Sequence, residues 1–205
     1  TSRSVTVGNA APPPPPPPGS SALSTLVASM QPGEWRSLTT SNINPTFAAN
    51  GASGYGMGYG DDMAWDPASR QAFYLGGDHN DLAQFVSYTE STNSWQRLPR
   101  PSWLSSGTIH GYNHTAINEA TGDIYHHPFN GGSGVYKYRI SSGTWSTLPN
   151  APTSNACCDA LEYFPELGGL VWVHGYGDVW LFTESTQQWS QLASGLDFGY
   201  ATWQF

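Results

Sequence analysis

The motif Trp-x-x-Leu occurs four times in this chain and constrains its fold more than any other feature. The four copies begin at Trp35, Trp95, Trp145 and Trp189. In the last three copies, a Tyr or Phe stands seven positions before the tryptophan, and a polar run such as Thr-Glu-Ser-Thr-Asn-Ser separates the two aromatic residues. Such runs form turns. The pattern therefore predicts a β-hairpin whose first strand ends near the first aromatic residue and whose second strand starts at the tryptophan.

A second predicted hairpin precedes each of these three. Its two strands are expected at residues 63–67 and 71–75, at 116–119 and 123–125, and at 161–165 and 170–173. Each unit then holds four short strands. The tryptophans are 50 residues apart from Trp95 to Trp145 and 44 apart from Trp145 to Trp189, close to the roughly 40–50 residues of one β-propeller blade.

The expected fold is therefore an all-β β-propeller over residues 34–205, with about three complete four-stranded blades. Residues 35–38 align with a lone outermost strand and residues 200–205 with a lone innermost strand. Because a propeller ring needs about four to eight blades, three and a half cannot close one. We expect either that the chain continues beyond residue 205 or that an oligomer completes the ring.

The unit over residues 60–100 resembles the repeats of kelch-type propellers, including the central domain of galactose oxidase. The resemblance rests on an apolar strand followed by Gly76 and Gly77, then Tyr88, then Trp95 at a fixed distance. It implies a propeller of four-stranded blades for residues 34–205. The other two units depart from the pattern, since the double glycine is displaced to residues 131–132 in one and replaced by His-Gly-Tyr-Gly in the other.

Residues 1–33 differ from the rest and are expected to form a proline-rich arm and linker. Seven consecutive prolines at positions 12–18 impose an extended polyproline II helix, which rises about 3.1 Å per residue. We expect a stiff spacer that joins the propeller to an attached structure through residues 1–22. A ligand for an aromatic-lined groove is the alternative. Residues 22–30 are expected to form one short helix at most.

The charge balance narrows the classes of partner. The net charge is −8, from 15 acidic and seven basic residues. Nucleic acid and membrane partners are not expected, because a phosphate-tracking groove needs clustered Lys and Arg, and no apolar run reaches the roughly 20 residues that cross a bilayer. Only 11% of the residues are charged and 14% are aromatic. This composition favours a folded protein at an extracellular or particle surface.

Strand direction predicts where a site lies. Loops that join the second strand to the third, and the fourth to the next blade, emerge on the same face because neighbouring strands alternate in direction. These loops carry most of the His, Asp and Tyr residues of interest. The candidate ligand-binding residues are Tyr59, Asp61, Asp62, Asp78, His79, His110, Tyr112, His114, His127, His174, Tyr176 and Asp178.

Three interpretations of this face remain open. Tyrosine rings beside hydrogen-bonding groups suit a glycan or protein ligand, whereas imidazole and carboxylate together suit several divalent metals. Alternatively, histidines at strand ends cap backbone groups and stack on the next blade. No cofactor is predicted, since the set of copper ligands implied by the galactose oxidase resemblance is not matched. We expect a recognition or structural module, with a carbohydrate-active or metal-dependent enzyme as the alternative.

Overall fold

A computed structural model describes residues 20–43, 46, 59–60, 62–77, 83–104, 110–129, 131–154, 156–157, 159–175 and 177–197. The strands of this part form three antiparallel four-stranded sheets, each built from consecutive strands. The first sheet holds β1 (Ala64–Asp66), β2 (Gln71–Gly76), β3 (Gln84–Thr89) and β4 (Ser94–Arg97). The second holds β5 (Thr115–Asn118), β6 (Asp123–His126), β7 (Val135–Arg139) and β8 (Thr144–Leu148). The third holds β9 (Ala160–Phe164), β10 (Gly169–His174), β11 (Asp178–Thr183) and β12 (Gln188–Ala193).

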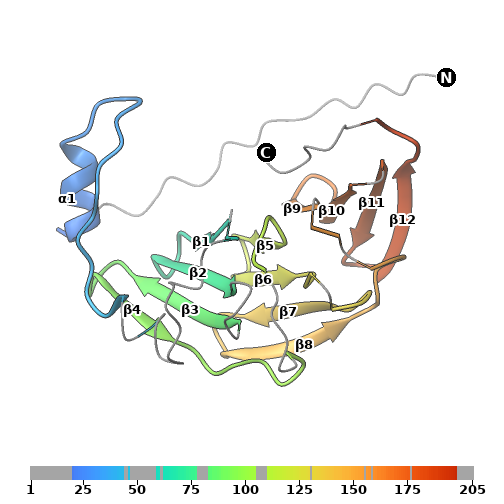
Figure 1. Ribbon diagram of the computed structural model, residues 1–205, viewed down its shortest axis with the longest axis horizontal. Coiled ribbons are helices and arrows are strands. Elements are labelled where there is room, and N and C mark those ends of the chain that lie inside the picture. Colours follow the sequence, from blue (N-terminus) through green and yellow to red (C-terminus); the bar gives the residue numbers. More distant parts are fainter. Residues whose placement is uncertain are drawn as a thin grey trace.

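The three sheets stand side by side in sequence order (Figure 1). Their first strands are neighbours, because β5 contacts both β1 and β9. A parallel bridge between Asn113 and Ala160 joins the chain just before β5 to the start of β9. This is the arrangement of propeller blades, with the first strand of each blade innermost. The predicted all-β class and the three complete four-stranded blades are confirmed.

The aromatic pairs that predicted the hairpins lie directly opposite one another across neighbouring strands. Tyr88 faces Trp95, Tyr138 faces Trp145 and Phe182 faces Trp189. Their ring centroids are 5.4, 5.1 and 5.2 Å apart, respectively. Cross-strand aromatic contacts of this kind stabilise a hairpin and fix its register. The seven-residue spacing therefore corresponds to the same cross-strand aromatic contact in each of the three hairpins.

Apolar side chains fill both boundaries between sheets. Between the first and second sheets, the core includes Phe73, Leu75, Phe85, Ile124 and Tyr138, with Trp145 packed against it. Between the second and third sheets, it includes Tyr125, Val135, Leu170, Trp172 and Phe182. Alternate residues of a strand point to opposite faces. A middle sheet must therefore be apolar on both sides, as the second sheet is.

A polar network crosses the boundary between the second and third sheets. Glu184, in the β11–β12 turn, accepts hydrogen bonds from the hydroxyls of Tyr125 and Tyr163, the latter at 3.0 Å. Lys137 lies between Glu184 and Asp123, at 3.8 and 3.4 Å. Burial, followed by the hydrogen bond to Glu184, raises the pKa of the Tyr163 hydroxyl to about 12. The network therefore holds both tyrosines protonated and links the two sheets.

Replacing Glu184 with alanine is expected to lower the free energy of unfolding by about 1–3 kcal/mol, because two tyrosine hydroxyls and Lys137 lose their acceptor. Urea denaturation measures the change. Glu184→Gln keeps an acceptor oxygen and should lose less. Glu166→Ala, at an exposed turn position of the same sheet, is the matched control and should leave stability unchanged. Equal stability of E184A and E166A would contradict the role given to the network.

The N-terminal helix α1 (Ala22–Ala28) is short and lies against the first sheet (Figure 1). Ser21 caps it in a capping box and donates its hydroxyl to Glu90, in the β3–β4 turn. Glu90 also pairs with Arg70. The helix falls within the predicted range of residues 22–30. No helix in the described part of the chain is long and apolar enough to cross a membrane.

The expected lone outermost strand at residues 35–38 is wrong. Described residues 34–40 form no strand, and Trp35 is 97% exposed. The chain instead follows the outer edge of β4, where Ser41 forms a parallel bridge with Ser94 and Thr40 accepts a hydrogen bond from the Trp95 indole. The first Trp-x-x-Leu copy has alanine, Ala28, seven positions before its tryptophan. It therefore has no cross-strand aromatic partner.

The polyproline run and residues 200–205 lie outside the described residues.

Candidate functional site

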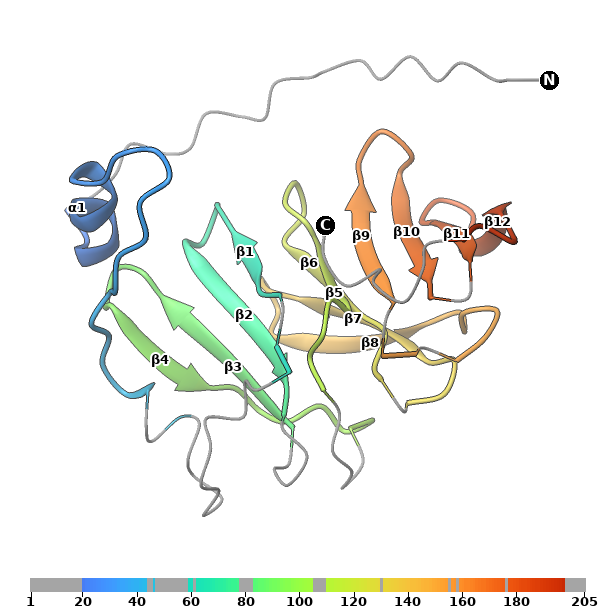
Figure 2. The ribbon, with the colours of Figure 1, turned by 45° about the horizontal axis from the view of Figure 1, so that its top comes forward.

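The long connections gather at one edge of the molecule, which we call the loop edge. Figure 2 shows the short β1–β2, β5–β6 and β9–β10 turns along its upper side, whereas β2, β4 and β10 run toward its lower side, into the longer connections. The antiparallel order of each sheet requires this separation. The described strand ends that lead into the longer connections therefore lie along one edge.

The predicted site residues divide into two groups. Asp61, Asp78, His79 and Tyr176 lie outside the described residues. The others are described and belong to the connections at the loop edge or to the strand ends next to them. They are Tyr59, Asp62, His110, Tyr112, His114, His127, His174 and Asp178.

Four of the residues near the loop edge form a compact group of rings, which we call the Tyr59 stack. The Tyr59 ring is stacked on His110, with centroids 4.2 Å apart and planes 14° apart. His110 is stacked in turn on Phe129, at 5.4 Å and 19°. Tyr112 packs edge-on against Phe129 and its hydroxyl lies 2.7 Å from Nδ1 of His110. Tyr59 and Phe129 remain half-buried, so the two ends of the stack are accessible.

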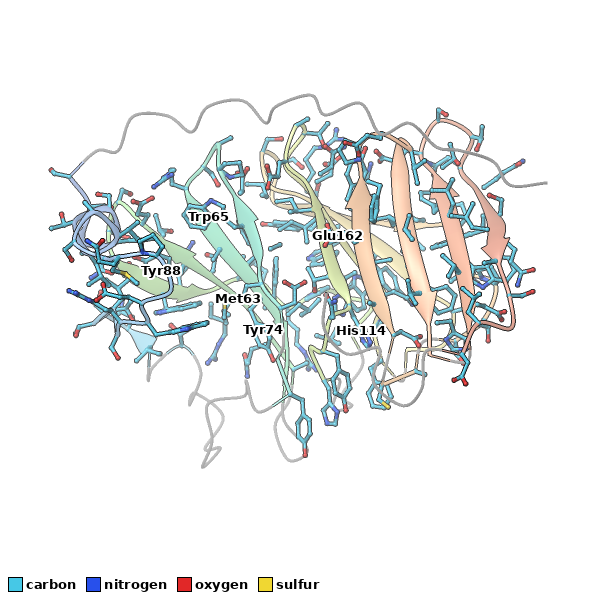
Figure 3. All side chains as sticks on the ribbon, turned by 90° about the horizontal axis from the view of Figure 1, so that it is seen from above. Met63, Trp65, Tyr74, Tyr88, His114 and Glu162 are labelled. Carbon is cyan, nitrogen blue, oxygen red and sulfur yellow. The ribbon has the colours of Figure 1, made fainter. Side chains whose placement is uncertain are left out.

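Three histidines form a buried band behind the stack. His114, His126 and His127 are each 0% exposed; Figure 3 marks His114 at the end of β5 nearest the loop edge. Nδ1 of His126 lies 3.0 Å from the Thr115 hydroxyl, and Nδ1 of His127 lies 3.0 Å from the Gly134 carbonyl oxygen. His127 packs edge-on against Trp172, at 4.9 Å. These contacts agree with the interpretation in which histidines at strand ends cap backbone groups and stack on the next blade.

Burial keeps the three histidines of this band in their neutral form. It lowers the pKa of His126 to about 3 and that of His127 to about 4, with repulsion from neighbouring histidines adding to the effect. The pKa of His114 is also lowered well below its ordinary value, first by burial and then by His126 and His127. All three imidazoles are therefore neutral at pH 7, and none is exposed to meet a ligand directly.

A histidine–carboxylate pair lies at the β10 end of the loop edge. Nδ1 of His174 is 2.9 and 3.0 Å from the two carboxylate oxygens of Asp159. The backbone amides of Ala156 and Gly175 also donate to Asp159, at 2.8 and 2.7 Å. Burial raises the pKa of Asp159, although these hydrogen bonds oppose the shift. The carboxylate thus orients the His174 ring and ties together the β8–β9 and β10–β11 connections.

Sequence reasoning missed three of these residues. Phe129, Asp159 and His126 are not among the candidate residues predicted from the sequence. Phe129 lies next to Pro128 in a loop that already held a candidate histidine, which was the available signal. Within the described ranges, no three His, Cys, Asp or Glu side chains are placed to hold a metal ion.

Comparison with known proteins shows similarity to solved structures. No family model matches the sequence, and no curated protein matches it. Among solved structures, the chain is similar to TolB from Acinetobacter baumannii, with 12% sequence identity and a TM-score of 0.47. The alignment covers 64% of this chain and 31% of the TolB chain. The chain thus spans less than a third of that protein, and no function follows from the similarity.

Proposed function

We propose that the chain is a non-enzymatic recognition module that binds a glycan or protein ligand through its loop edge. The Tyr59 stack carries this proposal. It offers the half-buried rings of Tyr59 and Phe129 next to polar groups of His110 and Tyr112. Flat apolar rings beside hydrogen-bonding groups suit the apolar faces and hydroxyls of sugar rings, which favours a glycan over a protein.

The buried histidines support recognition rather than turnover. His114 and His127 are fully buried and neutral, so they hold the loops in place rather than exchange protons with a substrate. Ligand contact is then assigned to Tyr59, Phe129 and the half-buried carboxylates Asp62 and Asp178. This assignment keeps the half-buried members of the described candidate residues and adds Phe129.

The family and setting belong to the same proposal. We assign the blades to the kelch type because of the Gly76–Gly77, Tyr88 and Trp95 pattern. A proline-rich arm in front of the blades suits display at a cell or particle surface, with residues 1–22 joined to another structure. A surface module of this kind needs no cofactor.

Replacing Tyr59 with alanine is expected to weaken glycan binding about tenfold, because one stacking face is lost, which corresponds to about 1.4 kcal/mol. A glycan array first identifies the ligand, and titration calorimetry then compares the variants. Phe129→Ala should have a similar effect. Trp35→Ala removes a 97% exposed ring outside the Tyr59 stack and should bind like the unmodified chain.

An activity assay on the same purified chain distinguishes the proposed recognition module from the alternative enzyme. Release of product from an array glycan by the purified chain, abolished by a chelator or by His79→Ala, would establish a metal-dependent carbohydrate-active enzyme. Binding without product release supports the recognition module. Unchanged binding by both Tyr59→Ala and Phe129→Ala would remove the Tyr59 stack from the proposal.

A further inference from the structure

The backbone beside the Tyr59 stack packs against one buried tyrosine of the first sheet. Tyr74, the fourth residue of β2, is 2% exposed and lies with Val86 and Met63 in a small apolar cluster. Figure 3 marks Tyr74 on the side of the first sheet that is nearest the loop edge. It is therefore a core residue placed next to the candidate site.

Two glycines let the connections that carry the stack approach the Tyr74 ring. A β-carbon added at Gly60 would lie 2.6 Å from Cε2 of Tyr74, and one added at Gly111 would lie 2.8 Å from the same atom. Both distances are shorter than the 3.0 Å below which the ring or the backbone has to move. Glycine, which has no β-carbon, permits this close approach. The edge of one ring is thus in contact with the connection before β1 and with the connection before β5.

The two glycines stand next to three of the four residues of the stack. Gly60 follows Tyr59, and Gly111 lies between His110 and Tyr112. The two connections are also joined directly, because the amide of Tyr112 donates to the carbonyl oxygen of Tyr59 at 2.7 Å. Packing of both connections on Tyr74 therefore sets the spacing of the Tyr59 and His110 backbones. At this spacing their rings stack with centroids 4.2 Å apart.

A third glycine completes the contact. A β-carbon at Gly76, at the end of β2, would lie 2.6 Å from the Gly111 amide nitrogen and 2.6 Å from the Tyr74 hydroxyl oxygen. In the other two sheets, the fourth residue of the second strand is also a buried ring. These residues are His126 and Trp172, and both pack against other rings. Tyr74 meets the backbone of three glycines, so its ring is placed to control where the chain runs.

We propose that Tyr74 is the positioning residue of the Tyr59 stack, because its buried ring spaces the Gly60 and Gly111 connections so that Tyr59 and His110 face each other. A binding site is held in its productive geometry by residues that pack behind it. Removal of the Tyr74 ring should therefore loosen the stack although every side chain of the stack is still present. The consequence for binding rests on the proposed function, whereas the effect on the stack does not.

NMR of His110 in the full chain without ligand tests the proposal. The ring currents of Tyr59 and Phe129, which stack on His110, shift its ring-proton signals upfield. Tyr74→Ala should move these signals toward those of an unstacked histidine. Tyr74→Phe keeps the ring edge and should keep most of the shift. Tyr138→Ala deletes the same side chain from the core between the first and second sheets, and it should destabilise the protein without moving the signals.

Glycan binding gives the functional readout. For a glycan identified on the array, Y74A should weaken binding about tenfold, as expected for Tyr59→Ala, because the stacking face is no longer held in place. Folded Y138A should bind like the unmodified chain. If the unmodified chain binds no array glycan while Y74A still displaces the His110 signals, the proposed function fails and the positioning role stands.

Two results would overturn the proposal. One is a folded Y74A variant whose His110 signals match those of the unmodified chain. The other is an equal displacement in Y138A, since the stack would then respond to any loss from the core. If Y74A does not fold, Gly111→Ala replaces it, because the added β-carbon forces the connection away from the Tyr74 ring and leaves the core side chains in place. G111A should displace the His110 signals, and unchanged signals would count against the role of Tyr74.

Discussion

Replacing Trp172 with alanine is expected to lower the free energy of unfolding by about 3–5 kcal/mol, the range for deleting a large buried aromatic side chain. Trp172 is 0% exposed in the core between the second and third sheets. Its ring contacts His127, His174 and Trp189, with centroids 4.9, 5.0 and 6.1 Å away. Its removal opens a cavity between two sheets. A domain of this size is stable by only about 5–15 kcal/mol in total, so the loss is a large share of the free energy of unfolding.

Chemical denaturation of three variants isolates this effect. Trp172→Phe keeps most of the ring and removes an indole N–H that has no hydrogen-bond partner among the described residues, so it should cost much less than W172A. Trp35→Ala deletes the same side chain from a position that is 97% exposed and should change nothing. If W172A and W35A unfold at the same denaturant concentration, the second and third sheets are not held together by this core.

Acid is expected to destabilise the protein well above the pH at which carboxylates alone would do so. The pKa of His126 falls from 6.5 to about 3 on folding, and that of His127 from 6.5 to about 4. Below pH 6.5 the unfolded chain therefore binds protons that the folded chain does not. Stability falls as pH falls in this range, by up to about 1.4 kcal/mol per pH unit for each such histidine. The loss continues to about pH 4 for His127 and about pH 3 for His126.

Other groups modify this acid response. Burial works to raise the pKa of Asp123, but hydrogen bonds and charges from Arg139 and Lys137 outweigh it and lower the pKa. Asp123 thus also contributes stability that is lost in acid. Asp159 opposes the trend, because burial raises its pKa and its protonation in the folded state offsets part of the loss. Glu162 acts in the same direction, because burial also raises its pKa. With three buried histidines against two such carboxyls, net stability still falls from pH 6.5 to pH 4.

Denaturant midpoints at pH 8, 6 and 5 measure this dependence. His114→Phe removes one buried titrating group whose pKa is lowered by burial, and it should make the slope against pH shallower. Glu166→Ala, at an exposed turn, should leave the slope unchanged. Equal midpoints at pH 8 and pH 5 in the unmodified chain would show that the three histidines are not buried in solution.

The hairpins could be predicted because their determinants are local. The pair Tyr138 and Trp145 meets across one turn, so a fixed spacing in the sequence reports the contact directly. The same motif led to the wrong prediction of a strand at residues 35–38. The residue seven positions before Trp35 is alanine, so no ring faces this tryptophan across a turn. The helix boundary at Ala28 was approximate for the same reason, since residues 22–30 carry only weak local signals.

The site was harder to predict because its contacts join distant segments. Strand alternation was enough to place His110 and Tyr112 at one edge. It did not reveal that Phe129 completes the stack across two sheets. The pair of Asp159 and His174, at the open end of the β9–β10 hairpin, was also missed. Histidines in similar sequence contexts also differ in how deeply they are buried, which the sequence does not show. His114 is enclosed only because the second and third sheets meet there.

The bond between Ser21 and Glu90 has a consequence for how the module is oriented. Glu90 belongs to a turn between outer strands, on the side of the molecule opposite the loop edge. The described chain at Ser20 and Ser21 is therefore held on the side of the molecule opposite the loop edge. In the proposed display at a surface, attachment from this side would leave the Tyr59 stack facing away from the carrier.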